Sequence, residues 1–193
     1  DARLRDRVVS AETAAALIQP GETVAMSGFT GSGYPKAVPM ALARRIEEAH
    51  LLGHPFQIRL MTGASTAPEL DGALAKADGI AMRMPFQSDP DARNRINEGK
   101  LDYIDIHLSH VAQHVWFGFY GEIDTAVIEV SATRDDGALV PSPSAGHHKT
   151  GPDLARQVTP DANDVQPPGV AGRHGPHPPT ALPPPRTPAR PRP

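Results

Sequence analysis

Cysteine is absent from the 193 residues, which excludes disulfide bonds and thiolate catalysis. Aromatic residues are scarce, at 5%, and no apolar run approaches the roughly 20 residues of a membrane-spanning helix. Lysine and arginine (19) nearly balance aspartate and glutamate (22), so the net charge of −3 gives no global field for nucleic acid or anionic lipid. The composition therefore predicts a cytoplasmic protein with neither nucleic acid nor a membrane as partner.

Proline, in contrast, is abundant, with 22 residues that crowd toward the end of the chain, for example at 178–179 and 183–185. Proline lacks an N–H donor and interrupts helices and central strands. We therefore predict two regions, a folded α/β domain at residues 1–144 and a Pro-rich, disordered or degenerate tail at 145–193. The chain begins with Asp1 rather than methionine, which we interpret as a fragment or a processed start.

Between these limits the chain alternates helical and strand patterns. Ser10 is a typical N-cap for a short helix, and Val38, Leu42 and Ile46 recur every four residues, as on one face of an amphipathic helix. Strands are expected at residues 23–27, 56–61, 103–106 and 123–130. This alternation favours an open, mainly parallel sheet flanked by helices, with ligands at the carboxyl ends of the strands. The loops after residues 27, 61 and 106 are therefore candidates for function.

Two further helices carry start signals. Thr66 with Glu69 three residues later fits a capping box. Asp89 followed by Pro90 fits an N-cap with proline at the first helical position, and Gly99 is a plausible residue just beyond the end of that helix.

The candidate loops allow a structural and a functional interpretation. Glycines at 28, 31 and 33 let a ligand approach backbone N–H groups, but they match neither a P-loop nor a dinucleotide fingerprint, and a tight turn explains them equally well. The hydroxyl of Ser65 could contact a thioester or a carboxylate, although it could also cap the next helix.

Other side chains are weaker candidates. His107, His110 and His114 invite a metal interpretation, and His110 and His114 would share one helix face. A zinc site needs a third ligand and a second shell, and no recognisable ligand spacing lies nearby, so we predict no metal. Glu129 could in principle be a covalent nucleophile, but a single acidic residue on a strand more often has a structural place. The absence of a Gly-x-Ser-x-Gly elbow leaves a serine-hydrolase route without support.

Several sequence blocks together resemble the acetyl-CoA hydrolase/transferase family, which includes succinyl-CoA:acetate CoA-transferases. The blocks occur in the family's order over roughly residues 5 to 144. They are Ser27-Gly28-Phe29-Thr30, Tyr34-Pro35-Lys36-Ala37-Val38-Pro39, Met61-Thr62-Gly63-Ala64-Ser65, Arg83-Met84-Pro85-Phe86-Gln87, Ile96-Asn97-Glu98-Gly99, Asp105-Ile106-His107-Leu108-Ser109 and Ala126-Val127-Ile128-Glu129.

The resemblance implies the CoA-transferase type of open α/β fold and a reaction on acyl-CoA thioesters. In this family a glutamate attacks the thioester, and CoA then passes to a carboxylate such as acetate or succinate, or the intermediate is hydrolysed. By matching, Ser65 and Gly63 would lie near the thioester, and Gly28, Phe29 and Thr30 would line the acyl or CoA end. No permanently bound cofactor is implied, because coenzyme A thioester is a substrate.

The resemblance also implies that the glutamate nucleophile lies in the second half of the family's longer chain. We therefore expect no catalytic nucleophile here, and a chain that is inactive alone, pairing as a homodimer or with a missing C-terminal domain. The alternative is a non-catalytic CoA-ester-binding protein or a degenerate fragment. Hydrolase and transferase activities, and the choice of acyl group and acceptor, stay open.

Overall fold

The computed structural model describes residues 8–65, 67–133, 139–142 and 150–163. Its main sheet has the strand order β6-β5-β3-β1-β7-β8, and β9 also pairs with β7. Every pair is parallel except β7 with β8, which confirms the predicted mainly parallel sheet. The strands are β1 (Thr23–Ser27), β3 (Ile58–Met61), β5 (Ile80–Met84), β6 (Asp102–Tyr103), β7 (Thr125–Thr133), β8 (Leu139–Pro141) and β9 (Gln157–Ala162).

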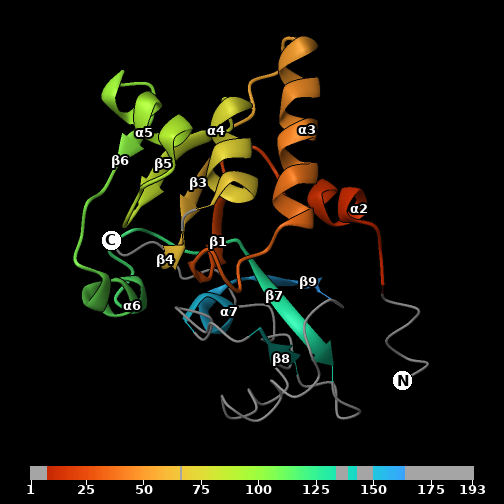
Figure 1. The fold of residues 1–193 in the computed structure, drawn as a ribbon, viewed down its shortest axis with the longest axis vertical. Helices are drawn as coiled ribbons and strands as arrows, with labels where there is room; N and C mark the ends of the chain where they lie inside the picture. Colours follow the sequence, from red (N-terminus) through yellow and green to blue (C-terminus); the bar gives the residue numbers. More distant parts are fainter. Residues whose placement is uncertain (1–7, 66, 134–138, 143–149, 164–193) are drawn as a thin grey trace, which may run out of the picture.

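Helices lie on both faces of this sheet (Figure 1). On one face, which we call the α3 face, are α2 (Ala11–Ala16), α3 (Ala37–Leu51), the π-helical turn η1 (Pro68–Gly72) and α4 (Ala73–Lys76), with α5 (Pro90–Asn97) packed beside α4 and η1. The other, the α6 face, carries α6 (Leu108–Trp116) and α7 (Thr150–Leu154). None of the described helices combines the length and apolar character needed to cross a membrane.

Most of the local helix signals are confirmed. The Ser10 hydroxyl accepts the backbone N–H of Thr13 at the start of α2. The Asp89 carboxylate accepts two N–H groups at the start of α5, and Gly99 follows that helix with a φ of +68°, a conformation that glycine adopts without strain. In α3 the predicted stripe of Val38, Leu42 and Ile46 is buried.

Two local predictions are wrong. The helix after β3 does not begin with a capping box, because its N-cap is Ala67 and no side chain caps it; Thr66 lies outside the described residues. Glu69, the second residue of the predicted capping box, instead accepts a hydrogen bond from Tyr34. The strand expected at 103–106 is only Asp102–Tyr103, which pairs with Met82 and Arg83, and residues 105 and 106 lie beyond the end of β5 at Met84.

The folded part also extends past the boundary predicted at residue 144. α7 and β9 lie beyond it, and β9 pairs with β7 over six residue pairs, from Thr125↔Gln157 to Val130↔Ala162. Pro160 fits because β9 pairs with β7 alone among the described strands, so one edge needs no N–H donor. The prolines in 150–162 are isolated, whereas the runs that prompted the tail prediction lie outside the described residues.

Candidate functional site

The two loops predicted to bind substrate meet at one edge of the sheet. β2 (Phe29–Thr30) follows β1 and β4 (Ala64–Ser65) follows β3, and they pair in parallel, with Phe29 opposite Ala64 and Thr30 opposite Ser65. Because β1 and β3 are parallel neighbours, both loops emerge at their carboxyl ends. The fold thus brings together all five predicted residues, Gly28, Phe29, Thr30, Gly63 and Ser65. The loop after residue 106 leads into α6 and does not join this ladder.

Close packing explains the glycine at position 28. A Cβ atom there would lie 2.7 Å from the Tyr34 nitrogen and 2.8 Å from the Ser32 carbonyl oxygen. Phe29 and Ser32 exchange backbone hydrogen bonds of 2.9 and 3.0 Å, which closes the loop into a tight turn. The turn leaves Phe29 52% exposed, so it can contact a ligand.

A buried carboxylate anchors the end of this loop. Glu129 on β7 is only 2% exposed, and its oxygens accept hydrogen bonds from Lys36 Nζ (2.5 Å), Ser142 Oγ (2.6 Å) and Asn163 Nδ2 (3.1 Å). Lys36 also donates to the Tyr34 carbonyl and lies 4.1 Å from the centre of its ring. Because three donors satisfy the buried charge, Glu129 has a structural place and is poorly positioned to be a nucleophile.

Asp161, a residue that the sequence interpretation missed, fixes the start of α3. One carboxylate oxygen accepts the backbone N–H groups of Lys36 (2.9 Å), Ala37 (2.9 Å) and Val38 (3.1 Å). A negative charge is favourable at the N-terminus of this 15-residue helix. The sequence held one indirect signal, since residues 33–36 before α3 include no serine, threonine, aspartate or asparagine that could cap it.

Tyr34 connects the same loop to η1. Its hydroxyl donates to Glu69 Oε2 at 2.8 Å. Burial, followed by the hydrogen bond to the Glu69 carboxylate, raises the pKa of the Tyr34 phenol well above its ordinary value. The phenol therefore stays a hydrogen-bond donor through the physiological range.

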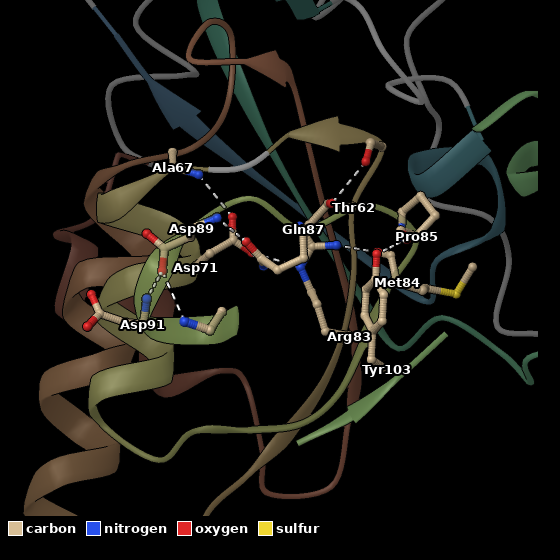
Figure 2. Close-up of polar contacts among 12 residues, drawn as sticks. Thr62, Ala67, Asp71, Arg83, Met84, Pro85, Gln87, Asp89, Asp91 and Tyr103 are labelled. Atoms are coloured by element: carbon tan, nitrogen blue, oxygen red, sulfur yellow. Dashed lines mark hydrogen bonds and ion pairs between the residues drawn. The ribbon is translucent and has the colours of Figure 1, made fainter. Parts of the chain in front are cut away.

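A second buried network holds the chain just after β4 (Figure 2). Arg83 on β5 and Asp71 in η1 are both fully buried and form an ion pair at 2.7 Å. The second Asp71 oxygen accepts the Ala67 N–H at 3.0 Å, and the Gln87 side chain donates to the first at 3.0 Å. Figure 2 shows Asp71 between Ala67 and Arg83, so the network ties the segment after Ser65 to the end of β5.

This network continues to the start of α5. The Asp89 N–H donates to Gln87 Oε1 at 2.5 Å, and the Asp89 carboxylate accepts the N–H groups of Asp91 and Ala92. Burial is the largest influence on the carboxyl group of Asp89 and raises its pKa. Gly72 lies close by, because a Cβ atom there would be 3.0 Å from Asp89 Oδ2.

The histidines that suggested a metal site have other contacts. His107 caps α6, since its Nδ1 accepts the Ser109 N–H at 3.3 Å. The rings of His110 and His114 stack with centroids 6.0 Å apart, and His114 Nδ1 is hydrogen-bonded to the Tyr120 hydroxyl at 3.1 Å. Over the part of the chain that the structure describes, three or more metal-ligating side chains nowhere converge.

Solved structures show which known fold this chain shares. RipA from Yersinia pestis has a TM-score of 0.65 at 17% identity, covering 84% of this chain and 38% of that one. Glutaconate coenzyme A-transferase from Acidaminococcus fermentans has a TM-score of 0.59 at 11% identity, covering 79% and 68%. At such identities the likeness concerns the fold alone, which is that of the CoA-transferases.

The chain matches the acetyl-CoA hydrolase/transferase N-terminal domain over residues 2–176 and belongs to that family. It is 41% identical over 165 residues to succinyl-CoA:acetate CoA-transferase of Clostridium kluyveri, covering 86% of this chain and 30% of that protein. It is 44% identical over 163 residues to propanoyl-CoA:succinate CoA transferase of Escherichia coli, covering 84% and 33%. The chain thus spans about a third of the length of these relatives, and the match includes α7 and β9.

Proposed function

We propose that this chain forms the substrate-side part of an enzyme that transfers CoA from an acyl-CoA thioester to a small carboxylate, such as acetate or succinate, or that hydrolyses acetyl-CoA. The observation that carries the proposal is the pairing of β2 with β4, which joins the two loops that resemble the family's substrate loops. Family membership supplies the class of chemistry. The CoA thioester is the substrate, and no permanently bound cofactor is part of the proposal.

Five residues form the proposed binding wall. Backbone N–H groups can stabilise a tetrahedral oxyanion where the chain approaches a ligand closely, as glycines allow. In this proposal Gly63 and Ser65 contact the thioester end, and Gly28, Phe29 and Thr30 line the acyl or CoA end.

The attacking carboxylate is proposed to come from outside this site. Covalent CoA transfer needs an accessible carboxylate that can reach the thioester carbonyl. The two glutamates that touch this loop are both engaged, Glu69 by Tyr34 and Glu129 by Lys36, Ser142 and Asn163. The chain alone is therefore expected to bind acyl-CoA without turning it over.

Two measurements on the purified chain test this proposal. Calorimetric titration with acetyl-CoA should give saturable binding that Gly28→Ala weakens at least severalfold, because the new Cβ displaces the loop. Gly31→Ala is the matched control, since a Cβ atom there meets nothing within 4 Å. Assays of CoA transfer from acetyl-CoA or succinyl-CoA should show no turnover. Turnover that disappears in Glu129→Gln would overturn the proposed place of the nucleophile.

The second candidate is a non-catalytic CoA-ester-binding or degenerate protein, favoured by the engagement of both nearby glutamates. If acetyl-CoA binds saturably but is still not turned over after the remaining part of a relative's chain is added, the result supports a binding module. Absent binding with a non-cooperative melt supports a degenerate product. We also propose a cytoplasmic location, which cell fractionation tests. Pairing as a homodimer or with a further domain is tested by sedimentation.

A further inference from the structure

An apolar pocket lies between the sheet and the helices of the α6 face. Its cavity volume is about 30 Å³, which suits a short hydrocarbon group rather than a large ligand. α6 contributes Val111 and Val115, α7 contributes Pro152, and β3 contributes Met61. Apart from two threonines, the described residues that line the pocket are apolar or glycine, and none is charged.

Small residues create this space. Ala25 on β1 and Ala126 on β7 are paired neighbours in the sheet, and both line the pocket. Gly151 of α7 lies directly over them, since a Cβ atom there would be 3.3 Å from the Ala25 Cβ and 3.8 Å from the Ala126 Cβ. The short helix α7 therefore rests on the alanines, and beside it the sheet is left incompletely covered.

The pocket extends to the edge of the sheet that carries the candidate loops. Thr62 lines it at the carboxyl end of β3, directly before Gly63, and its hydroxyl donates to the Gly63 carbonyl oxygen at 3.1 Å. Ile128 lines it as well, and this residue is paired with Ser27, directly before Gly28. Apolar space thus begins beside both loops.

We infer that this pocket binds the hydrocarbon part of a short-chain acyl thioester. The inference rests on the proposed function, because it assumes that the thioester lies at residues 28–30 and 63–65. Uncharged walls favour methylene groups over a carboxylate or a phosphate, which would lose hydration without a partner. Ala25 and Ala126 then limit the length of the acyl chain.

The test uses S-acyl-N-acetylcysteamine thioesters, which carry an acyl chain and a thioester but no nucleotide, and a chain labelled with [13C-methyl]methionine. The Met61 methyl signal should shift on binding, whereas Met26, buried on the α3 face, should not. Affinity should rise about fourfold per added methylene from acetyl to butyryl, as expected for burial of apolar surface.

Matched substitutions on one strand locate the effect. Ala126→Val fills the pocket and should abolish the gain from acetyl to butyryl, whereas Ala132→Val on the exposed part of β7 should leave it unchanged. Because Ala126 is fully buried, its variant could fail to fold. Val115→Leu, on α6 and also lining the pocket, is the second variant and should likewise reduce the gain from acetyl to butyryl. A cooperative melt of each protein confirms its fold.

The outcomes separate this inference from the proposed function. Binding of acetyl-CoA with no dependence on acyl length, or with an unmoved Met61 signal, overturns the pocket and leaves the proposed function standing. If the chain binds S-butyryl-N-acetylcysteamine with a shift of the Met61 methyl signal but does not bind acetyl-CoA, the result supports the pocket and contradicts the proposed function. Equal effects of Ala126→Val and Ala132→Val also overturn the pocket.

Discussion

The α3 face of the sheet is covered by several helical segments, including the 15-residue helix α3, whereas the described part of the α6 face is covered by the short helices α6 and α7. Leu42, Ile46 and Leu74 on the α3 face are fully buried, and its cluster of buried apolar residues is the larger of the two. The α6 face has the apolar pocket and, at the end of α6, the exposed aromatic residues Trp116, Phe117 and Phe119. The contrast indicates that the α3 face supplies most of the stability and that, among the described residues, the α6 face is the less completely packed of the two.

The largest expected effect lies in the buried ion pair on the α3 side. Arg83→Met leaves the Asp71 carboxylate buried without its cation, which should lower the free energy of unfolding by about 3–5 kcal/mol. Urea unfolding followed by circular dichroism measures it. Lys100→Met removes an exposed ion pair with Glu98 and is the control, with no measurable change expected. Equal effects of the two substitutions would contradict the account.

The same truncation on each face tests the comparison directly. Ile46→Ala on the α3 face leaves a new cavity and should cost about 3–4 kcal/mol of unfolding free energy. Ile123→Ala only widens the existing pocket on the α6 face and should cost about 2 kcal/mol. Thermal or urea unfolding of both variants gives the difference, and a larger loss for Ile123→Ala would reverse the comparison.

On the α3 face, Tyr34 should make the free energy of unfolding depend on pH. Its pKa is raised in the folded chain, so its contribution to stability is complete below the ordinary value of 10.0 and is lost as the pH rises above it. One such group changes the unfolding free energy by at most about 1.4 kcal/mol per pH unit. The difference in unfolding free energy between the wild-type chain and Tyr34→Phe should therefore narrow above about pH 10. A constant difference in unfolding free energy would contradict this assignment.

The smallest effect on stability is expected at the exposed aromatic residues. Replacing Trp116, Phe117 and Phe119 by glutamine should change the unfolding free energy by no more than about 0.5 kcal/mol per site. Sedimentation velocity should nevertheless show less self-association, because exposed apolar patches promote it. The control replaces Leu51 and Leu52, exposed at the end of α3, by glutamine as well. An equal decrease in self-association there would show that the aromatic residues of the α6 face have no particular role in it.

Patterns local in the sequence predicted much of this fold. A few consecutive residues suffice to predict the Asp89 cap, the apolar stripe of α3 and strand β1. The structure contains each of them. The two candidate loops could be placed at one edge because parallel strands share their carboxyl ends.

Contacts distant in sequence could not be predicted in this way. The cap of α3 by Asp161 spans more than 120 residues, and the Glu129 carboxylate is shared by donors from three segments. The density of prolines also led to the prediction that residues 157–162 belong to a tail, whereas they form β9. An edge strand tolerates the single Pro160. The pocket depends on alanines and a glycine whose alignment only the fold creates.

Amide hydrogen exchange with and without acetyl-CoA tests the central claim most directly, that the loops joined by β2 and β4 form one acyl-CoA site. The account predicts slower exchange at residues 28–34 and 62–65 together when acetyl-CoA is added, with no change in α5. Protection of only one loop, or protection confined to regions away from both, would contradict it.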